Sequence, residues 1–404
     1  MRLDVYASGR HAGVLAREGS DNYVFSYLPD CPPESFVSLT MPVRLESYVA
    51  RHLHPIFEMN LPEGELLGRI LARLRKASVV SNLELLAFTG RALIGRLAVV
   101  PEDTDLTAPT DQGDLTALMS TPDTRALFND LLDRFVERGV SGVMPKVMSL
   151  GKSKVGSRLT AADTAALYKS EDDDYPYLAF NELCCLRVVR RAGIEVPDFE
   201  LSADGRVLRI ERFDRNGGKA LGFEDFCVLH GLNSGEKYSG SYERLVKTAT
   251  TWAAADLKTA TRRELFRRIV LCWMLHNGDA HQKNFGMLYP DAKSVRLSPM
   301  YDIVTTTVYP NLRHDTPALT LEGRKLWALK RGAWRRFART HCALSDADAQ
   351  RQVEELRAAV EDTAGEIEAE AADASGPLAR GRAEFVAELV RTWRTGAEDV
   401  ALGI

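Results

Sequence analysis

The stretch Leu275–Asn284 reads LHNGDAHQKN, and the fold of this 404-residue chain can be inferred outward from it. An apolar segment with helical spacing, residues 264–276, runs directly into it. The buried stripe expected for that helix consists of Leu265, Ile269, Cys272 and Trp273. Glycine often takes the left-handed position that ends a helix, so Gly278 predicts the helix end there. Asp279 and Asn284 should then lie on the loop that follows.

The spacing on this loop is typical of phosphotransferases. Asp279 and Asn284 stand five positions apart, as do the catalytic Asp and the metal-binding Asn in the loop of protein kinases. Two short strand-like runs follow, 285–289 and 295–297, and Asp302 comes after them. In kinases a hairpin also separates the catalytic loop from the Asp that holds magnesium. The order of these parts therefore predicts a kinase-like site.

Other interpretations of the same residues stay open. An Asp that follows Asn-Gly is commonly a turn residue, and His281 could be a loop or helix-capping histidine. A metal site built from His276, Asp279 and His281 is an alternative, although no second pair of ligands is apparent.

Composition and charge are those of an ordinary globular protein. Hydrophobic residues make up 45% of the chain and charged residues 27%. The net charge of −4 and the pI of about 6.1 argue against a general nucleic-acid binder. No apolar run approaches a membrane span, and the first residues predict a strand rather than a signal peptide. The six cysteines show no C-x-x-C spacing, which favours reduced thiols and a cytoplasmic location.

The chain divides into three expected parts. Residues 1–105 predict antiparallel strands, a helix after Pro62 and a second helix that begins with a capping box at Ser81–Glu84. Residues 106–213 should form the nucleotide-binding part of the N-terminal lobe. Residues 214–404 should form a helical C-terminal lobe that carries the catalytic loop, with helices near 223–229, 242–248, 264–276, 349–368 and 384–398. The expected fold is α+β, a two-lobed kinase-like fold with a β-rich N-terminal lobe, an added N-terminal subdomain and an all-helical C-terminal lobe.

Two further features suit a nucleotide site. Gly139 and Gly142 bracket Ser141 in a loop whose backbone N–H groups could contact phosphates, although most such loops are plain hairpin turns. The later Gly151-Lys152-Ser153 is not a P-loop, because Lys146 stands where a glycine is required.

The second feature is a lysine on a strand followed by a glutamate on a helix. Lys169 ends an apolar strand, 165–169, and Glu182 lies early in a helix expected over 178–192. Kinases use such a pair to hold the α- and β-phosphates, so Glu182 is the candidate partner of Lys169. The alternative is a surface lysine and a first-turn glutamate favoured by the helix dipole.

Together these segments resemble the HipA family, the serine/threonine-protein kinase toxins of bacterial HipBA-type toxin–antitoxin pairs. The matching stretches occur in family order and span most of the chain: FEMNLPEG (57–64), SGVMPKV (141–147), NELCCLRVVRRAGIEVPD (181–198), IERFDR (210–215), HNGDAHQKNF (276–285) and SPMYDI (298–303).

The resemblance implies a role for each matching residue. Asp279 would activate the acceptor hydroxyl, Asn284 and Asp302 would hold Mg²⁺ and bind ATP, and Lys169 would contact the α- and β-phosphates. The further ATP-binding residues implied are Ser141, Gly142, Lys146, Glu211, Phe213 and His281. The implied partners are a HipB-like helix-turn-helix antitoxin, which would supply most of the DNA contact, and a protein substrate such as an aminoacyl-tRNA synthetase.

One position departs from the family pattern. Members carry a regulatory serine at the start of the Gly-rich loop, where this chain has Gly139. The nearest hydroxyl is that of Ser141, so either Ser141 is the autophosphorylation site or the antitoxin alone restrains the protein.

Two other functions fit the same loop. A small-molecule kinase of the aminoglycoside-phosphotransferase type also has a G-D-x-x-x-x-N loop, although the N-terminal module and IERFDR favour a protein kinase. A non-catalytic co-repressor with a kinase fold is the third possibility.

Overall fold

The computed structural model describes residues 1–19, 22–62, 67–68, 71, 81–104, 106, 115–121, 123–124, 126–131, 146–148, 154, 160–162, 165–171, 174–373 and 377–404. Most of the helix expected after Pro62 and the whole Gly139–Gly142 loop, with Ser141, lie outside the described residues. Those expectations stay predictions.

The first sheet has the antiparallel order β4-β3-β2-β1-β5. Its strands are β1 (Arg2–Ala7), β2 (Arg10–Glu18), β3 (Asn22–Tyr27), β4 (Tyr48–Ala50) and β5 (Leu97–Pro101). Its alternating apolar side chains pack in one cluster with the short α1 (Pro55–Glu58) and α3 (Asn82–Thr89). The capping box at Ser81 and Glu84 is confirmed, because each side chain accepts the other's backbone N–H.

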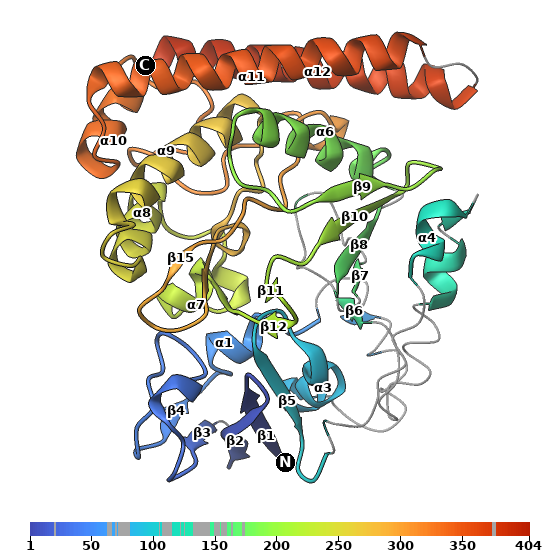
Figure 1. Cartoon of the computed structure of the whole chain (residues 1–404). Coiled ribbons are helices and arrows are strands. Elements are labelled where there is room, and N and C mark those ends of the chain that lie inside the picture. The colour runs from blue at the N-terminus through green and yellow to red at the C-terminus, as the bar shows by residue number, and fades with distance from the viewer. Residues whose placement is uncertain are drawn as a thin grey trace.

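The second sheet has the order β6-β7-β8-β10-β9 and lies beside α6 (Leu178–Arg191) in Figure 1. Its strands are β6 (Lys146–Met148), β7 (Thr160–Ala162), β8 (Ala166–Ser170), β9 (Phe199–Leu201) and β10 (Val207–Glu211). On β8, Lys169 lies opposite Leu208 of β10. Successive side chains of a strand point to opposite faces of the sheet, so Lys169 points to the face opposite that of its two neighbours on β8. The helix predicted over 178–192 is confirmed, and Gly193 ends it with a positive φ of 70°.

A third sheet, β13-β14-β15, lies within the helix-rich half, residues 214–404, so the expectation of an all-helical C-terminal lobe is wrong. Its strands are β13 (Gly222–Asp225), β14 (Gly286–Tyr289) and β15 (Arg296–Leu297). The hairpin expected after the catalytic loop is therefore confirmed, with β14 and β15 antiparallel. The helix expected over 223–229 is wrong in its first half, because Gly222–Asp225 pairs with β14 and α7 spans only Phe226–His230. Periodicity over so short an apolar run does not separate strand from helix.

The short α4 (Ala117–Ser120) lies near the second sheet. The remaining helices of the helix-rich half are α8 (Tyr242–Trp252), α9 (Lys258–Met274), α10 (Ala333–His341), α11 (Asp346–Asp373) and α12 (Pro377–Gly403). Figure 1 shows α11 and α12 as a long pair that runs across α6 and α9. The stripe predicted for α9 is buried, each of its four side chains at most 1% exposed. No described helix is long and apolar enough to cross a membrane.

The IERFDR segment joins the first sheet to the rest of the molecule. Arg212 donates two hydrogen bonds to the buried Asp214 carboxylate and a third to the Leu93 carbonyl. The N–H of Gly95 donates to the same carboxylate at 2.7 Å. These bonds hold the pKa of Asp214 below its usual value despite burial. The segment that follows β10 is thus fixed against the start of β5.

Candidate active site

Lys169, Glu182 and Asp302 form a cluster of charges at the junction of β8, α6 and the segment after β15. The Nζ atom of Lys169 lies 2.7 Å from Oε1 of Glu182 and 3.0 Å from Oδ1 of Asp302. Lys169 is 2% exposed and Glu182 is fully buried. The alternative of a surface lysine and a first-turn glutamate favoured by the helix dipole is therefore wrong, since α6 has no acidic residue in its first turn. Buried charges require partners, and here two carboxylates converge on one ammonium group.

Asn284 lies against Asp302 on the other side of this cluster. Its Nδ2 donates to the backbone carbonyl of Asp302 at 3.1 Å and to Oδ2 at 3.2 Å. Asp302 has a φ of +56°, a conformation uncommon outside glycine and often associated with functional sites. Asn284 and Lys169 together hold Asp302 in that conformation.

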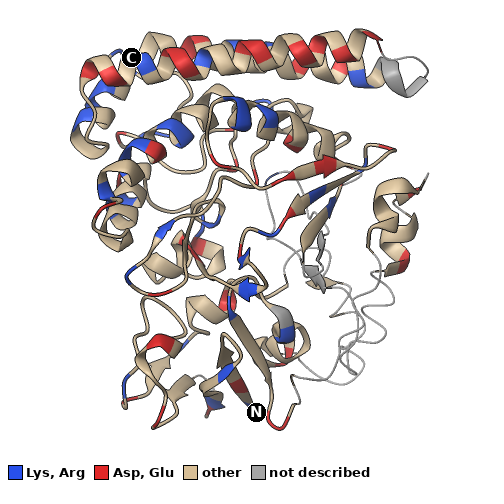
Figure 2. Cartoon of the chain, in the orientation of Figure 1, with Lys and Arg blue, Asp and Glu red and all other residues tan. Residues whose placement is uncertain are grey.

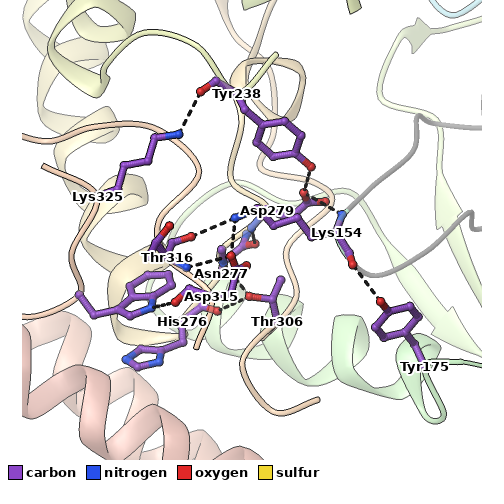
Figure 3. A network of polar contacts seen from close by, with 12 residues as sticks. Lys154, Tyr175, Tyr238, His276, Asn277, Asp279, Thr306, Asp315, Thr316 and Lys325 are labelled. Carbon is purple, nitrogen blue, oxygen red and sulfur yellow. Dashed lines mark hydrogen bonds and ion pairs between the residues drawn. The ribbon is translucent and has the colours of Figure 1, made fainter. Parts of the chain in front are cut away.

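Asp279 is a buried carboxylate that already accepts hydrogen bonds. Only 2% of the residue is exposed, and Oδ1 accepts the Tyr238 hydroxyl at 2.5 Å and the Lys154 N–H at 3.2 Å (Figure 3). Burial, with a smaller contribution from the charge of Asp302, raises the pKa of Asp279 to about 6, against the effect of these two hydrogen bonds. A base with a pKa near neutrality is well matched to proton transfer in the cell.

Lys154 connects Asp279 to a second acidic residue. Its Nζ lies 2.7 Å from Oδ1 of Asp315 and donates to the Thr316 carbonyl at 3.1 Å, as Figure 3 shows. Nothing in the sequence pattern points to Tyr238, Lys154 or Asp315 as site residues. They lie 41, 125 and 36 positions from Asp279, and no local motif marks them.

Four further residues expected at the site are described by the structure in whole or in part: His281, Phe213, Glu211 and Lys146. His281 is 2% exposed, its ring centroid is 5.0 Å from that of Tyr238, and burial lowers its pKa well below the usual value. Its Nδ1 has no hydrogen-bond partner in the described part of the chain. Phe213 packs against Tyr301, with ring centroids 5.4 Å apart, beside Asp302. Glu211 ends β10 with an exposed side chain, and of Lys146 only the backbone on β6 is described.

The oxygen donors fit magnesium better than a histidine-bound metal. Mg²⁺ is usually held by one or two protein oxygens together with phosphates, and Asn284 and Asp302 supply such a pair. Within the described ranges, no group of three or more His, Cys, Asp and Glu side chains could hold a metal ion. The alternative site at His276, Asp279 and His281 is therefore wrong. The His276 ring instead stacks on Trp327, with centroids 4.5 Å apart.

The fold and this cluster define a two-lobed α+β protein of the kinase-like class. Two family models match the chain, the HipA N-terminal domain over residues 3–100 and the HipA-like C-terminal domain over residues 139–364. The chain therefore belongs to the HipA family.

The chain is also similar to curated relatives and, in its fold, to a solved structure. "Putative kinase Y4dM" of Sinorhizobium fredii is 29% identical over 294 residues, 68% of this chain and 67% of that protein. "Putative kinase Y4mE" of the same organism is 26% identical over 370 residues, 83% of this chain and 85% of that protein. The Shewanella oneidensis HipA in a complex with HipB and operator DNA superposes with a TM-score of 0.73 at 19% identity. That match covers 98% of this chain and 96% of the Shewanella chain.

Proposed function

We propose that this chain is an ATP- and Mg²⁺-dependent serine/threonine protein kinase that acts as the toxin of a HipBA-like pair in the cytoplasm. The observation that carries the proposal is the position of Lys169, buried between Glu182 and Asp302 at 2.7 and 3.0 Å. A lysine paired with a helix glutamate and placed beside the metal-binding Asp is the arrangement by which kinases hold ATP phosphates. The names of the relatives support the same class of activity.

Each residue then has a defined task in phosphoryl transfer. Lys169 binds the α- and β-phosphates, and Glu182 keeps its ammonium group in place. Asn284 and Asp302 hold Mg²⁺, which supplies positive charge to neutralise the phosphate oxygens. Asp279 accepts the proton of the acceptor hydroxyl, and its raised pKa suits it to that exchange. Nδ1 of His281, which has no partner among the described residues, donates its proton to a phosphate oxygen, and Phe213 and Glu211 contact the adenine.

The proposal also includes an antitoxin partner, an autophosphorylation site and a protein substrate. The Shewanella structure contains HipB and operator DNA, which supports an antitoxin partner that carries the DNA contact. We place autophosphorylation at Ser141, whose hydroxyl is the nearest one to the family's usual position, Gly139 here. There a phosphate would add negative charge beside the nucleotide. The protein substrate we propose is an aminoacyl-tRNA synthetase.

The test is transfer of labelled phosphate in a cell lysate by the full chain, with Asp279→Asn as the inactive control. Label in phosphoserine or phosphothreonine of a polypeptide, absent with the variant, supports the proposal. Asp279-dependent label in small solutes alone would favour the small-molecule kinase. No transfer at all, despite a folded wild-type chain, would favour the co-repressor. Mass spectrometry of the labelled peptides would identify the substrate and report on Ser141.

A further inference from the structure

Asn181, the residue before Glu182 on α6, is bonded to the segment that carries Asp302. Its Oδ1 accepts the backbone N–H of Thr305 at 2.9 Å, and its Nδ2 donates to the Thr305 carbonyl at 2.9 Å. Both residues are fully buried. One amide therefore satisfies both backbone groups of a residue that belongs to no helix or strand.

The same threonine is bonded to the C-terminal helix pair. The indole Nε1 of Trp393, on α12, donates to Oγ1 of Thr305 at 2.7 Å, and Trp393 is also fully buried. Thr305 is thus held by α6 from one side and by α12 from another. We call Asn181, Thr305 and Trp393 the amide clamp.

Surface ion pairs hold α11 against the outer face of α6. Arg187 of α6 lies 2.7 Å from Glu370 and 3.2 Å from Glu366 of α11. Figure 2 shows acidic and basic residues interspersed along α11 and α12, and Arg394 of α12 pairs with Glu361 of α11 at 2.7 Å. Exposed pairs such as these contribute little individually. The buried hydrogen bonds of Thr305 with Asn181 and Trp393 therefore do more to fix how α6, this segment and α12 lie relative to one another.

Within the amide clamp, Asn181 directly precedes Glu182 in the chain, and Thr305 lies three positions after Asp302. Those two carboxylates come from elements 120 positions apart in the chain, yet both lie within 3.0 Å of one ammonium group. Apolar packing alone would fill the space between α6 and this segment without fixing their register. Paired hydrogen bonds fix it, because an unsatisfied buried amide or backbone group is costly.

We propose that Asn181, Thr305 and Trp393 are positioning residues that set the distance between Glu182 and Asp302, and through it the affinity for Mg·ATP. The C-terminal helix pair thereby becomes part of the support of the nucleotide site. The inference rests on the proposed kinase function and adds residues that touch neither nucleotide nor metal.

The test uses calorimetry of Mg·ATP binding to the full chain, with the Mg²⁺ concentration for half-maximal binding as second readout. Asn181→Leu, which keeps the number and branching of the side-chain heavy atoms and removes the amide, should weaken Mg·ATP binding at least about tenfold. Trp393→Phe should weaken it about three- to tenfold and raise the Mg²⁺ requirement in parallel. The double variant Asn181→Leu/Glu182→Gln should lose less affinity than the two single losses multiplied, because both act on the same lysine.

Matched controls separate positioning from loss of packing. Trp334 is fully buried, and its Nε1 has no hydrogen-bond partner in the described ranges, so Trp334→Phe removes the same volume without removing such a bond. Thr363→Val controls for Thr305→Val, since Thr363 is fully buried and, among the described residues, its hydroxyl bonds within its own helix, to the Ala359 carbonyl. Both controls should keep wild-type affinity for Mg·ATP.

The outcomes distinguish this inference from the proposed function. Affinities within twofold of wild type for Asn181→Leu and Trp393→Phe, or equal losses in Trp334→Phe, would overturn the inference alone. If Asn181→Leu does not fold, Trp393→Phe and Thr305→Val decide by the same criterion. A folded wild-type chain that binds no Mg·ATP would overturn the kinase proposal and this inference with it.

Discussion

The hydroxyl of Tyr238 donates to Oδ1 of Asp279 across 2.5 Å, at the oxygen that also accepts the N–H of Lys154. The proposed base is therefore occupied by two donors in this structure. An acceptor hydroxyl that approaches the same oxygen must compete with Tyr238, whose own pKa is raised by burial and by the charge of Asp279, so that it stays protonated.

Replacing Tyr238 by phenylalanine should shift the pH dependence of phosphorylation. The Tyr238 hydrogen bond lowers the pKa of Asp279, so its loss should raise that pKa further. The acid limb of kcat/KM should then move to higher pH, as measured over pH 5–9 with the substrate found in lysate. Tyr48→Phe is the control: it removes a hydroxyl that donates to the Pro42 carbonyl in the N-terminal part of the chain, and it should leave the profile unchanged. An unshifted acid limb in Tyr238→Phe would show that Asp279 is not the titrating group.

Asp279 should also impose a cost on stability that grows with pH. Its folded pKa of about 6 lies above the ordinary value of 3.8, so between these values the native state holds more protons than the unfolded state. Stability contributed by this group therefore falls as pH rises from about 4 to 6 and stays low above 6. Asp279→Asn should accordingly be more stable than wild type at pH 7–8, by up to about 3 kcal/mol. Urea denaturation at pH 4 and pH 8 measures the difference, which should vanish at the lower pH.

The same variant separates stability from catalysis. Asp279→Asn should lose phosphoryl transfer while Mg·ATP still binds, because Lys169 and Asp302 are intact. A variant that turned over at near wild-type rate would contradict the role assigned to Asp279.

Replacing Lys169 alone should lower the stability of the fold, and replacing Glu182 as well should restore much of it. Lys169→Met leaves the fully buried Glu182 without its cation and should cost about 3–5 kcal/mol of stability. Glu182→Leu added to it removes the buried carboxylate that has lost this lysine and should restore much of that stability. Neither variant should bind Mg·ATP. Thermal denaturation and calorimetry give the two readouts, and a double variant no more stable than Lys169→Met would contradict the pairing.

Local sequence patterns predicted the elements of this site but only part of its contacts. The capping box at Ser81, the end of α6 at Gly193 and the hairpin after Asn284 follow from short-range rules, and the structure has them. Glu182 could be proposed for Lys169 because the kinase layout places such a pair on neighbouring elements. By contrast, Tyr238, Lys154, Asn181 and Thr305 approach the site only through tertiary packing, over separations that no periodicity or motif describes.

The strand at 222–225 was missed for a related reason. Glu224 is fully buried in it and accepts hydrogen bonds from Ser38, Leu39 and Tyr289, two of which belong to the N-terminal part of the chain. The segment pairs with β14, 61 or more positions away. This pairing determines its strand conformation, although its local spacing is typical of a helix.

Asp315 approaches the loop that carries Asp279 so closely that position 278 requires a residue without a side chain. A Cβ atom there would lie 2.3 Å from Oδ2 of Asp315 and 2.7 Å from Oγ1 of Thr306. Gly278→Ala should therefore displace Asp315 or the loop itself, and with it Lys154 and the neighbouring Asp279. We expect phosphoryl transfer to fall at least about tenfold, with stability reduced by about 1–3 kcal/mol.

Gly365 is the matched control for that change, since it lies within α11 and a Cβ atom there meets no heavy atom within 4 Å. Gly365→Ala should raise stability by about 0.5–1 kcal/mol, because alanine is the better helix former, and leave activity unchanged. Activity assays and denaturation of both variants, side by side, measure the contrast. Should Gly278→Ala retain full activity, the close contact of Asp315 with the loop would have no part in placing Asp279.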